Sequence, residues 1–157
     1  MPVISRLVSI CLRTGELAFA AVVAGIIGSY LHSHDASHSW PGARFIYTEV
    51  VAGVSILLAL LWLLPFAGGF IHWPADVFLS LAWFAVFGLL VDYIHGTNCR
   101  GSVFDWAGIT QGGVCNRWKA SEAFSFLSAI FWIASAAVGV WFVHRTRKDR
   151  AVDAGVG

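Results

Sequence analysis

Four long apolar blocks constrain the fold of this chain more than any other feature of its sequence. They cover roughly residues 16–31, 45–66, 71–94 and 123–143. A helix needs about 20 apolar residues to cross the hydrocarbon core of a bilayer, and the blocks approach or exceed that length. The chain is 58% hydrophobic and only 12% charged, whereas soluble domains carry about a quarter charged residues. We therefore predict an all-α integral membrane protein whose four transmembrane helices form one bundle.

The whole chain, residues 1–157, is predicted to form this single domain. Pro65 is expected to end the second span, and Pro74 to begin the third. The first block is the shortest, and we expect an uncleaved span because no small-residue cleavage pattern follows it. Arg13 at its edge is expected to snorkel to the lipid headgroups. The predicted spans are about 13–32, 45–66, 73–95 and 121–144, with a tail at 145–157.

Lysine and arginine residues predict the orientation of the chain in the membrane. Six of the ten precede the first span or follow the fourth, and the other four lie in connections on the opposite side. The positive-inside rule then places both termini in the cytoplasm. The net charge of +1 does not favour a nucleic-acid-binding surface. The first and third connections are expected to face the outside or a lumen, where disulfides persist.

Two of the three cysteines lie in the longest polar connection, between the third and fourth spans. Cys99 and Cys115 bracket several glycines that let the chain turn back on itself. We predict a disulfide that closes this loop, and the alternative is two unpaired thiols. Cys11 stands alone near the cytoplasmic face, where reversible acylation is compatible with the sequence but not required by it.

An acid at the end of the third span is the main candidate for a special role. Ionisable residues in spans are costly, and the helix dipole disfavours Asp92 at a carboxyl end. Asp92 either forms a structural ion pair that fastens the third loop to the bundle, or joins His95 and Glu49 in a proton relay near the outer leaflet. We favour the ion pair. The expected partners of Asp92 are His95, Arg100, Arg117 and Lys119.

Four other acids have a simpler explanation. Each lies in or near the first turn of a predicted helix, where the partial positive charge of the helix dipole stabilises a carboxylate. This spacing explains them without chemistry. They are Glu16, Glu49, Asp76 and Glu122.

Small residues recur every four positions in the first span. Two adjacent rows consist of Ala20, Ala24 and Gly28, and of Ala21, Gly25 and Ser29. Small residues let helix backbones approach closely in lipid. We predict a packing face built on Ala21, Gly25, Gly28 and Ser29, against another span of the chain or a second copy. Val22 and Val23 are expected to tolerate larger side chains.

The first connection is a weak candidate for a metal site. It contains His32, His34, Asp35 and His38. In a helix, His34 and His38 would share a face, and imidazole suits zinc or copper. We favour a polar loop without metal, and we expect no cofactor. The sequence contains no recognisable catalytic motif, so we predict that the protein is not an enzyme.

Several segments spread along nearly the whole chain form a family pattern. They are residues 13–17, 28–31, 83–84, 87–93, 118–120 and 123–128, together with Cys99, Cys115, Trp132 and Ser135. This combination resembles the fungal branch of the MARVEL-domain tetraspan proteins. The resemblance implies a four-helix membrane domain with cytoplasmic termini, and it does not imply catalysis. Glu16 stands where the family often has glutamine, and the His-rich first loop departs from many relatives.

The sequence therefore predicts a non-enzymatic, membrane-organising tetraspan protein. The resemblance implies a role in membrane microdomains, membrane apposition or vesicle trafficking. The alternative is a small transporter or proton-coupled channel that uses Asp92, Glu49 and His95. A third hypothesis is a metal-binding membrane protein that uses residues 32–38. We expect lipids as partners, with a homo-oligomer or other membrane proteins, and a location in the plasma membrane or in secretory or endosomal vesicles.

Overall fold

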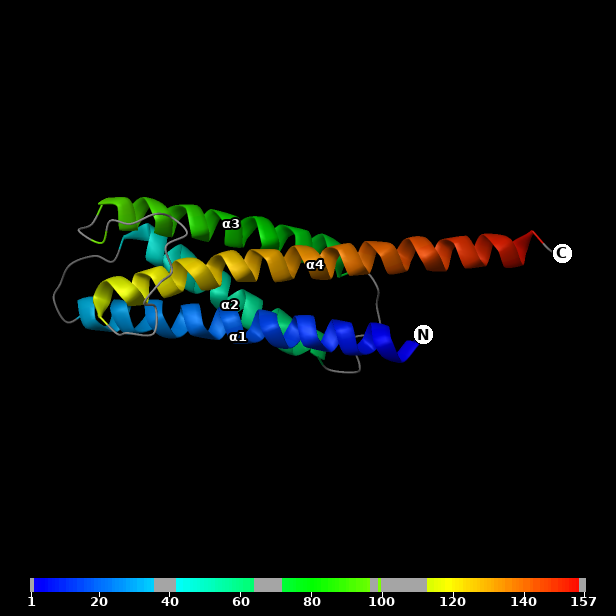
Figure 1. The fold of residues 1–157 in the computed structure, drawn as a ribbon, viewed down its shortest axis with the longest axis horizontal. Coiled ribbons are helices and arrows are strands. Elements are labelled where there is room, and N and C mark those ends of the chain that lie inside the picture. The colour runs from blue at the N-terminus through cyan, green and yellow to red at the C-terminus, as the bar shows by residue number, and fades with distance from the viewer. Residues whose placement is uncertain (1, 36–41, 64–71, 97–98, 100–112, 156–157) are drawn as a thin grey trace.

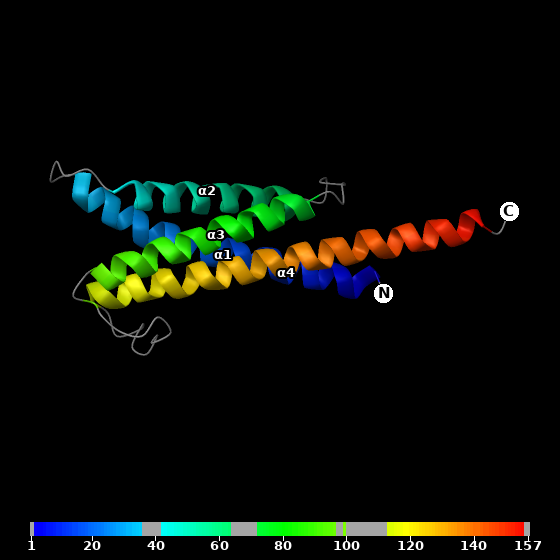
Figure 2. The same ribbon diagram turned by 90° about the horizontal axis from the view of Figure 1, so that it is seen from above.

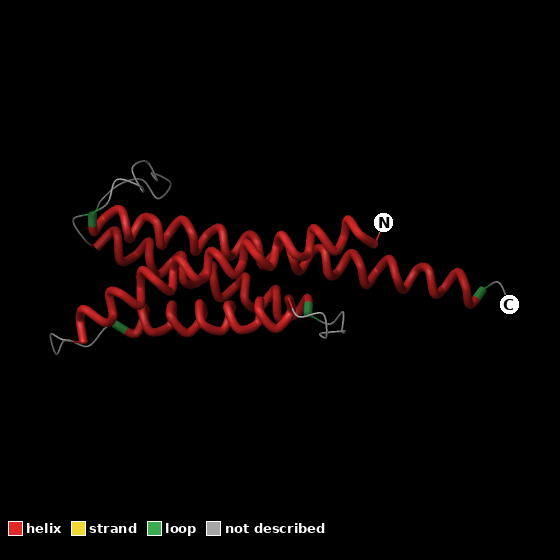
Figure 3. The backbone as a smooth tube through the Cα atoms, turned by 90° about the horizontal axis from the view of Figure 1, so that it is seen from below, coloured by secondary structure: helices red, strands yellow, loops and turns green. Residues whose placement is uncertain are grey.

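Four long helices make up nearly all of the described chain. The computed structural model describes residues 2–35, 42–63, 72–96, 99 and 113–155. The helices are α1 (Pro2–Asp35), α2 (Ala43–Leu63), α3 (Trp73–Gly96) and α4 (Val114–Ala154). Within those described residues no strand occurs (Figure 3). Each helix contains a segment long and apolar enough to cross a membrane. The predicted four-span, all-α fold is confirmed.

The helices lie side by side in an antiparallel bundle, with both chain termini at the same end (Figure 1). α4 packs most extensively against α3, and α1 packs against both α2 and α4. The contact between α2 and α3 is the least extensive (Figure 2). We call the end that carries the termini the inner end, after its predicted cytoplasmic side, and the opposite end the outer end.

Two helices are longer than the sequence predicted. α1 begins at Pro2, because proline suits the first position of a helix and no helix breaker follows it. α4 begins at Val114, directly after Gly113, whose φ of 100° is readily adopted only by glycine. α4 then continues through much of the predicted tail. It therefore projects beyond the other three helices at the inner end (Figures 1 and 2).

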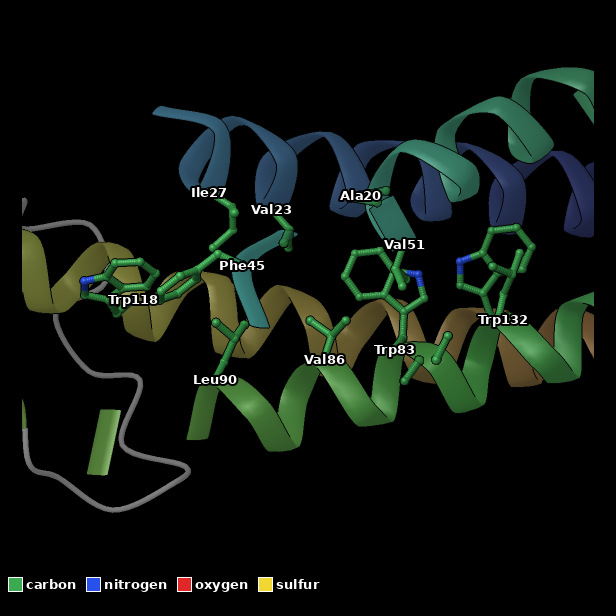
Figure 4. Packing of buried hydrophobic residues seen from close by; sticks show 14 of the residues in the cluster. Ala20, Val23, Ile27, Phe45, Val51, Trp83, Val86, Leu90, Trp118 and Trp132 are labelled. Carbon is green, nitrogen blue, oxygen red and sulfur yellow. The ribbon is translucent and has the colours of Figure 1, made fainter. Parts of the chain in front are cut away.

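The interior of the bundle is built around two fully buried tryptophans, Trp83 and Trp132, with smaller apolar residues of α1 packed nearby (Figure 4). The Trp83 indole N–H donates a 2.9 Å hydrogen bond to the Ser55 hydroxyl of α2. In lipid, such packing and interhelical hydrogen bonds hold helices together in place of water exclusion. Val23 is also fully buried, which argues against the expectation that it tolerates a larger side chain.

Close backbone approach occurs at two glycines that the sequence analysis did not single out. A Cβ atom on Gly15 would overlap the Phe131 ring of α4. A Cβ atom on Gly139 would lie 3.2 Å from the Cβ of Trp73, at the start of α3. These glycines therefore let α4 approach α1 and α3 in the inner half of the bundle.

The predicted packing face of α1 divides into two parts. A Cβ on Gly28 would lie 3.6 Å from Glu49 Oε1 of α2, an ordinary contact. Ala21, Gly25 and Ser29 are exposed, and a Cβ on Gly25 would meet nothing within 4 Å. The packing of these three residues against a second molecule stays a prediction.

Candidate functional site

The inner half of the bundle contains a buried group of charged, polar and aromatic side chains drawn from all four helices. Arg13 is 8% exposed, Asp76 is 2% exposed and Glu16 is fully buried. Ionisable groups within a span are rare and mark functional candidates. We call this group the inner ionic cluster. It consists of Arg13 and Glu16 of α1, Trp62 of α2, Asp76 of α3, and Trp132 and Ser135 of α4.

Hydrogen bonds connect the charged members of the cluster. Arg13 Nη1 and Nη2 donate to Asp76 Oδ1 and Oδ2, both at 2.9 Å, in a bidentate pair. Arg13 Nη1 also donates to Glu16 Oε2 at 2.8 Å. The remaining oxygen, Glu16 Oε1, accepts a hydrogen bond from the Ser135 hydroxyl. Every carboxylate oxygen of the cluster therefore has a partner.

Two indole rings complete the surroundings of the arginine. Arg13 Cζ lies 4.4 Å from the ring centroid of Trp62 and 5.2 Å from that of Trp132. Cation–π contacts of this kind strengthen when they are shielded from water. The His72 ring lies 4.8 Å from the Trp62 ring. The cluster thus fastens the inner ends of all four helices through one guanidinium.

The local sequence explains how these side chains meet. Arg13 and Glu16 are three residues apart, so they share one face of α1. Asp76 lies in the first turn of α3, where the helix dipole favours an acid. The expectation that Arg13 snorkels to the headgroups is wrong, because α1 extends well upstream and turns this side chain inward.

The dipole explanation holds for only one of the four acids to which it was applied. Asp76 lies in a first turn, but no acid lies in the first turn of α1, α2 or α4. α1 and α4 begin upstream of their predicted starts, which places Glu16 and Glu122 deep within their helices. The informative signal was the Arg13–Glu16 spacing at the edge of an apolar block, since two opposite charges on one helix face can pair within a membrane.

The outer end is closed by a second four-helix contact, which we call the outer aromatic cluster. It consists of Tyr30 of α1, Phe45 of α2, Tyr93 of α3 and Trp118 of α4. Ring centroids are 4.8 Å apart for Tyr30 and Trp118, and 5.0 Å apart for Phe45 and Tyr93. Both pairs have the edge-to-face geometry that aromatic rings prefer. Trp118 is only 5% exposed and points inward.

The predicted candidates Asp92, His95 and Glu49 lie in different environments. Asp92 Oδ2 lies 3.2 Å from Arg44 Nη1 of α2, and the Asp92 side chain is 74% exposed. Arg44 was absent from the predicted partners, so this pair links α3 to α2 rather than to the third loop. His95 is exposed, whereas Glu49 is half-buried on α2. A proton relay among the three stays a prediction.

The predicted disulfide is present. Cys99 and Cys115 are joined, with their Cα atoms 5.4 Å apart, and most of the loop between them lies outside the described residues. Cys115 lies in the first turn of α4, so the bridge ties the chain that follows α3 to the outer end of α4. Cys11 is free and exposed, and its acylation stays a prediction.

The proposed metal ligands mostly lie outside the part of the chain that can be described. His32 is exposed near the end of α1, but the side chain of His34 and all of His38 fall outside the described residues. Within the described part of the chain, no group of three His, Cys, Asp or Glu side chains is placed to hold a metal ion. The metal hypothesis for residues 32–38 therefore stays untested.

A match to a protein family agrees with the fold and covers the residues of both clusters. A family model described as a membrane-associating domain, MARVEL, matches residues 6–138. This range contains every member of the inner ionic cluster and of the outer aromatic cluster. No curated protein matches the chain. The match does not distinguish branches of the family, so the fungal branch stays a prediction. Since the matched range covers most of the sequence, the chain is a multi-pass membrane protein that belongs to the MARVEL family of membrane-associating domains.

Proposed function

We propose that this protein is a non-enzymatic organiser of the membrane in which it is embedded. Its role would be in microdomain organisation, membrane apposition or vesicle trafficking, and its first partners would be lipids. The family is membrane-associating, which supports the coarse part of this proposal. The proposed role as an organiser depends on where the bundle places its charged side chains and where it places its apolar ones.

The observation that carries the proposal is the separation of charge from the lipid-facing surface. Between the two clusters, the described acids Glu49 and Glu122 and the base Lys119 are buried or partly buried. The exposed acid of this region is Asp92, which lies beside the outer aromatic cluster and pairs with Arg44. The outward faces carry large apolar side chains, including Leu57 at 63%, Phe78 at 71% and Leu81 at 63% exposure. Four helices fastened to one another at both ends therefore offer lipid a surface that is apolar along most of their length.

Lipid extraction without detergent tests this proposal. The protein would be taken from its membrane in polymer-bounded nanodiscs, and the co-purified lipids and proteins compared with those of the bulk membrane. We expect assemblies with a distinct lipid composition, located in the plasma membrane or in secretory or endosomal vesicles. The double variant F78A/L81A should shift that composition toward the bulk membrane. V114A, which removes exposed apolar surface at the start of α4, is the matched control. Single copies surrounded by bulk lipid would contradict the proposal.

A proton-coupled transporter is the second candidate, and two acids with buried, unpaired oxygens favour it. Within the described structure, Glu122 Oε1 and Glu49 Oε2 are buried atoms without a hydrogen-bond partner. Buried polar atoms of this kind are uncommon, and each calls for an explanation. The clusters at both ends of the bundle nevertheless favour the organiser.

Proteoliposomes that contain a pH-sensitive dye distinguish the two functions. We expect no proton movement above that of empty vesicles. Proton movement that disappears in well-folded Asp92→Asn or Glu49→Gln protein would replace the organiser with a transporter that uses the predicted relay.

A further inference from the structure

The inner ionic cluster has one more acid than base. Arg13 contributes one positive charge, and Glu16 and Asp76 would each contribute one negative charge if both were ionised. α2 and α4 contribute no further charge beside the cluster, because residues 50–63 and 123–143 contain no charged residue. An uncompensated charge inside a low-dielectric region is strongly disfavoured, and a buried acid takes up a proton instead.

The hydrogen bonds indicate which acid keeps its charge. Asp76 accepts a bidentate pair from Arg13 and lies in the first turn of α3, where the helix dipole adds to its stabilisation. Glu16 accepts only one bond from Arg13, through a nitrogen that also serves Asp76. Its other oxygen faces the Ser135 hydroxyl. Asp76 is therefore the better place for the charge, and Glu16 the better place for a proton.

The contact between Glu16 and Ser135 suits a protonated carboxyl group. A serine hydroxyl both donates and accepts hydrogen bonds. The hydrogen between Ser135 Oγ and Glu16 Oε1 can therefore belong to either oxygen without loss of the contact. A protonated Glu16 would still be fully hydrogen-bonded, and the cluster would be neutral overall.

We propose that the inner ionic cluster is a proton-binding site in which Glu16 carries one exchangeable proton. This inference goes beyond the proposed function, since a membrane organiser needs no proton site. His72 is the other titratable group near the cluster. Its ring contacts Trp62, its backbone oxygen accepts the Asp76 N–H at 3.0 Å, and it is only partly buried. It lies directly before α3, one turn ahead of Asp76 at the inner end of the bundle.

Release of the proton would change the packing of the bundle. It would leave one net negative charge among α1, α3 and α4 in a region of low dielectric constant, where that charge is costly and the carboxylates of Glu16 and Asp76 repel each other. The site would thus make the stability of the bundle depend on the acidity of the compartment at the inner end.

Infrared spectroscopy of the full-length protein in lipid nanodiscs tests the proposal directly. A protonated carboxyl group has a C=O stretching band that a carboxylate lacks. At neutral pH, where an exposed glutamate is ionised, we expect this band in the wild type. E16Q should remove the component of this band that belongs to Glu16, and E122Q, which changes another buried acid, should keep that component. It should also be lost in D76N, because removal of one acid lets Glu16 ionise against Arg13.

Two further measurements keep the test decisive if a variant folds poorly. S135A should shift the frequency of the band without removing it, because it removes the hydrogen-bond partner of Glu16. The melting temperature of the wild type should fall as pH rises, since the folded state holds a proton that the unfolded state releases. E16Q should reduce this slope. A wild type without the band, a band whose intensity is the same in the wild type and E16Q, or equal slopes in the wild type and E16Q would overturn the proposal.

Discussion

The two ends of the bundle join the same four helices by different physics. The outer aromatic cluster uses several ring contacts, each of which is modest. The inner ionic cluster uses one guanidinium that serves two acids and two indoles. Loss of a ring should weaken the outer end by a limited amount. Loss of a charge should leave the remaining charges buried without a partner. The comparison therefore predicts a tolerant outer end and an all-or-none inner end.

The largest expected effect is the loss of the shared cation. R13Q leaves Glu16 and Asp76 buried without their positive partner, which costs about 3–5 kcal/mol for a broken buried pair. We expect a large fall in folded yield and in melting temperature, measured by size exclusion and thermal unfolding in nanodiscs. R44Q is the matched change at the outer end, where the arginine is half-exposed, and it should have little effect.

Removal of the whole charged set sharpens this prediction. The triple variant R13M/E16Q/D76N leaves no unpaired charge, so it should recover most of the stability that R13Q loses. If the triple variant were as unstable as R13Q, packing by the arginine stem and not charge would hold the inner end together.

Removal of the disulfide should have the next largest effect, and only at the outer end. A bridge across a loop of this size stabilises a fold by about 3 kcal/mol in the chain-entropy model. C99S/C115S should therefore lower the melting temperature while the inner ionic cluster stays intact. Thiol labelling of denatured, unreduced protein should modify Cys11 alone. If protein whose thiols were blocked at lysis showed three reactive thiols, that result would argue against both the bridge and the outward placement of this loop.

A glycine beside the inner ionic cluster should be far less tolerant than one near the outer end of the same helix. In G15A, the new Cβ would overlap the Phe131 ring, and overpacking of this kind typically costs about 1–3 kcal/mol. G25A adds a methyl group where nothing lies within 4 Å, so its melting temperature should match the wild type. A destabilised G25A with reduced self-association would instead indicate that this face packs against a second copy.

At the outer aromatic cluster, the loss of one ring should produce a graded effect. Tyr93→Leu removes edge contacts with Phe45 and Trp118, at about 0.5–1.5 kcal/mol for each aromatic pair. Tyr30→Leu should cost a similar amount, because Tyr30 also contacts both of those rings. Loss of the folded state in either variant would show that the outer end is as sensitive to substitution as the inner end.

The smallest expected effect is at Asp92. Its pair with Arg44 is exposed, and exposed ion pairs contribute about 1 kcal/mol or less. D92N should therefore change the melting temperature only slightly, and by less in high salt than in low salt. A loss comparable with that of R13Q would mean that Asp92 has a role that its exposed position does not explain.

The number of helices and the disulfide could be predicted because they depend on local features of the sequence. Apolar length determines where a chain can cross a membrane, and two cysteines in one polar loop have few alternative partners. The inner ionic cluster could not be predicted in the same way. It depends on the direction in which Arg13 faces, and that direction depends on where α1 begins and which helices surround it. Hydropathy alone does not show which side of a helix faces the other helices.

The same limit explains why the sequence favoured Asp92 over Glu16 and Asp76. An acid at a carboxyl end stands out by position, whereas acids near predicted amino ends are explained by the dipole. The true start of α1 at Pro2 removes that explanation for Glu16. The row of small residues was recognised, but which row faces inward was not, because α2 and α4 determine it together.

The distribution of the cluster along the chain has a consequence for how the protein is inserted into a membrane. Arg13 and Glu16 lie on one helix and neutralise each other, so α1 can enter the bilayer by itself. Asp76 is synthesised later, on α3, and its acid finds a cation only if α1 is already in place. Ser135 arrives last, on α4. We therefore expect the first helix to act as the template of biogenesis, with α3 retained at the translocation machinery until it meets Arg13.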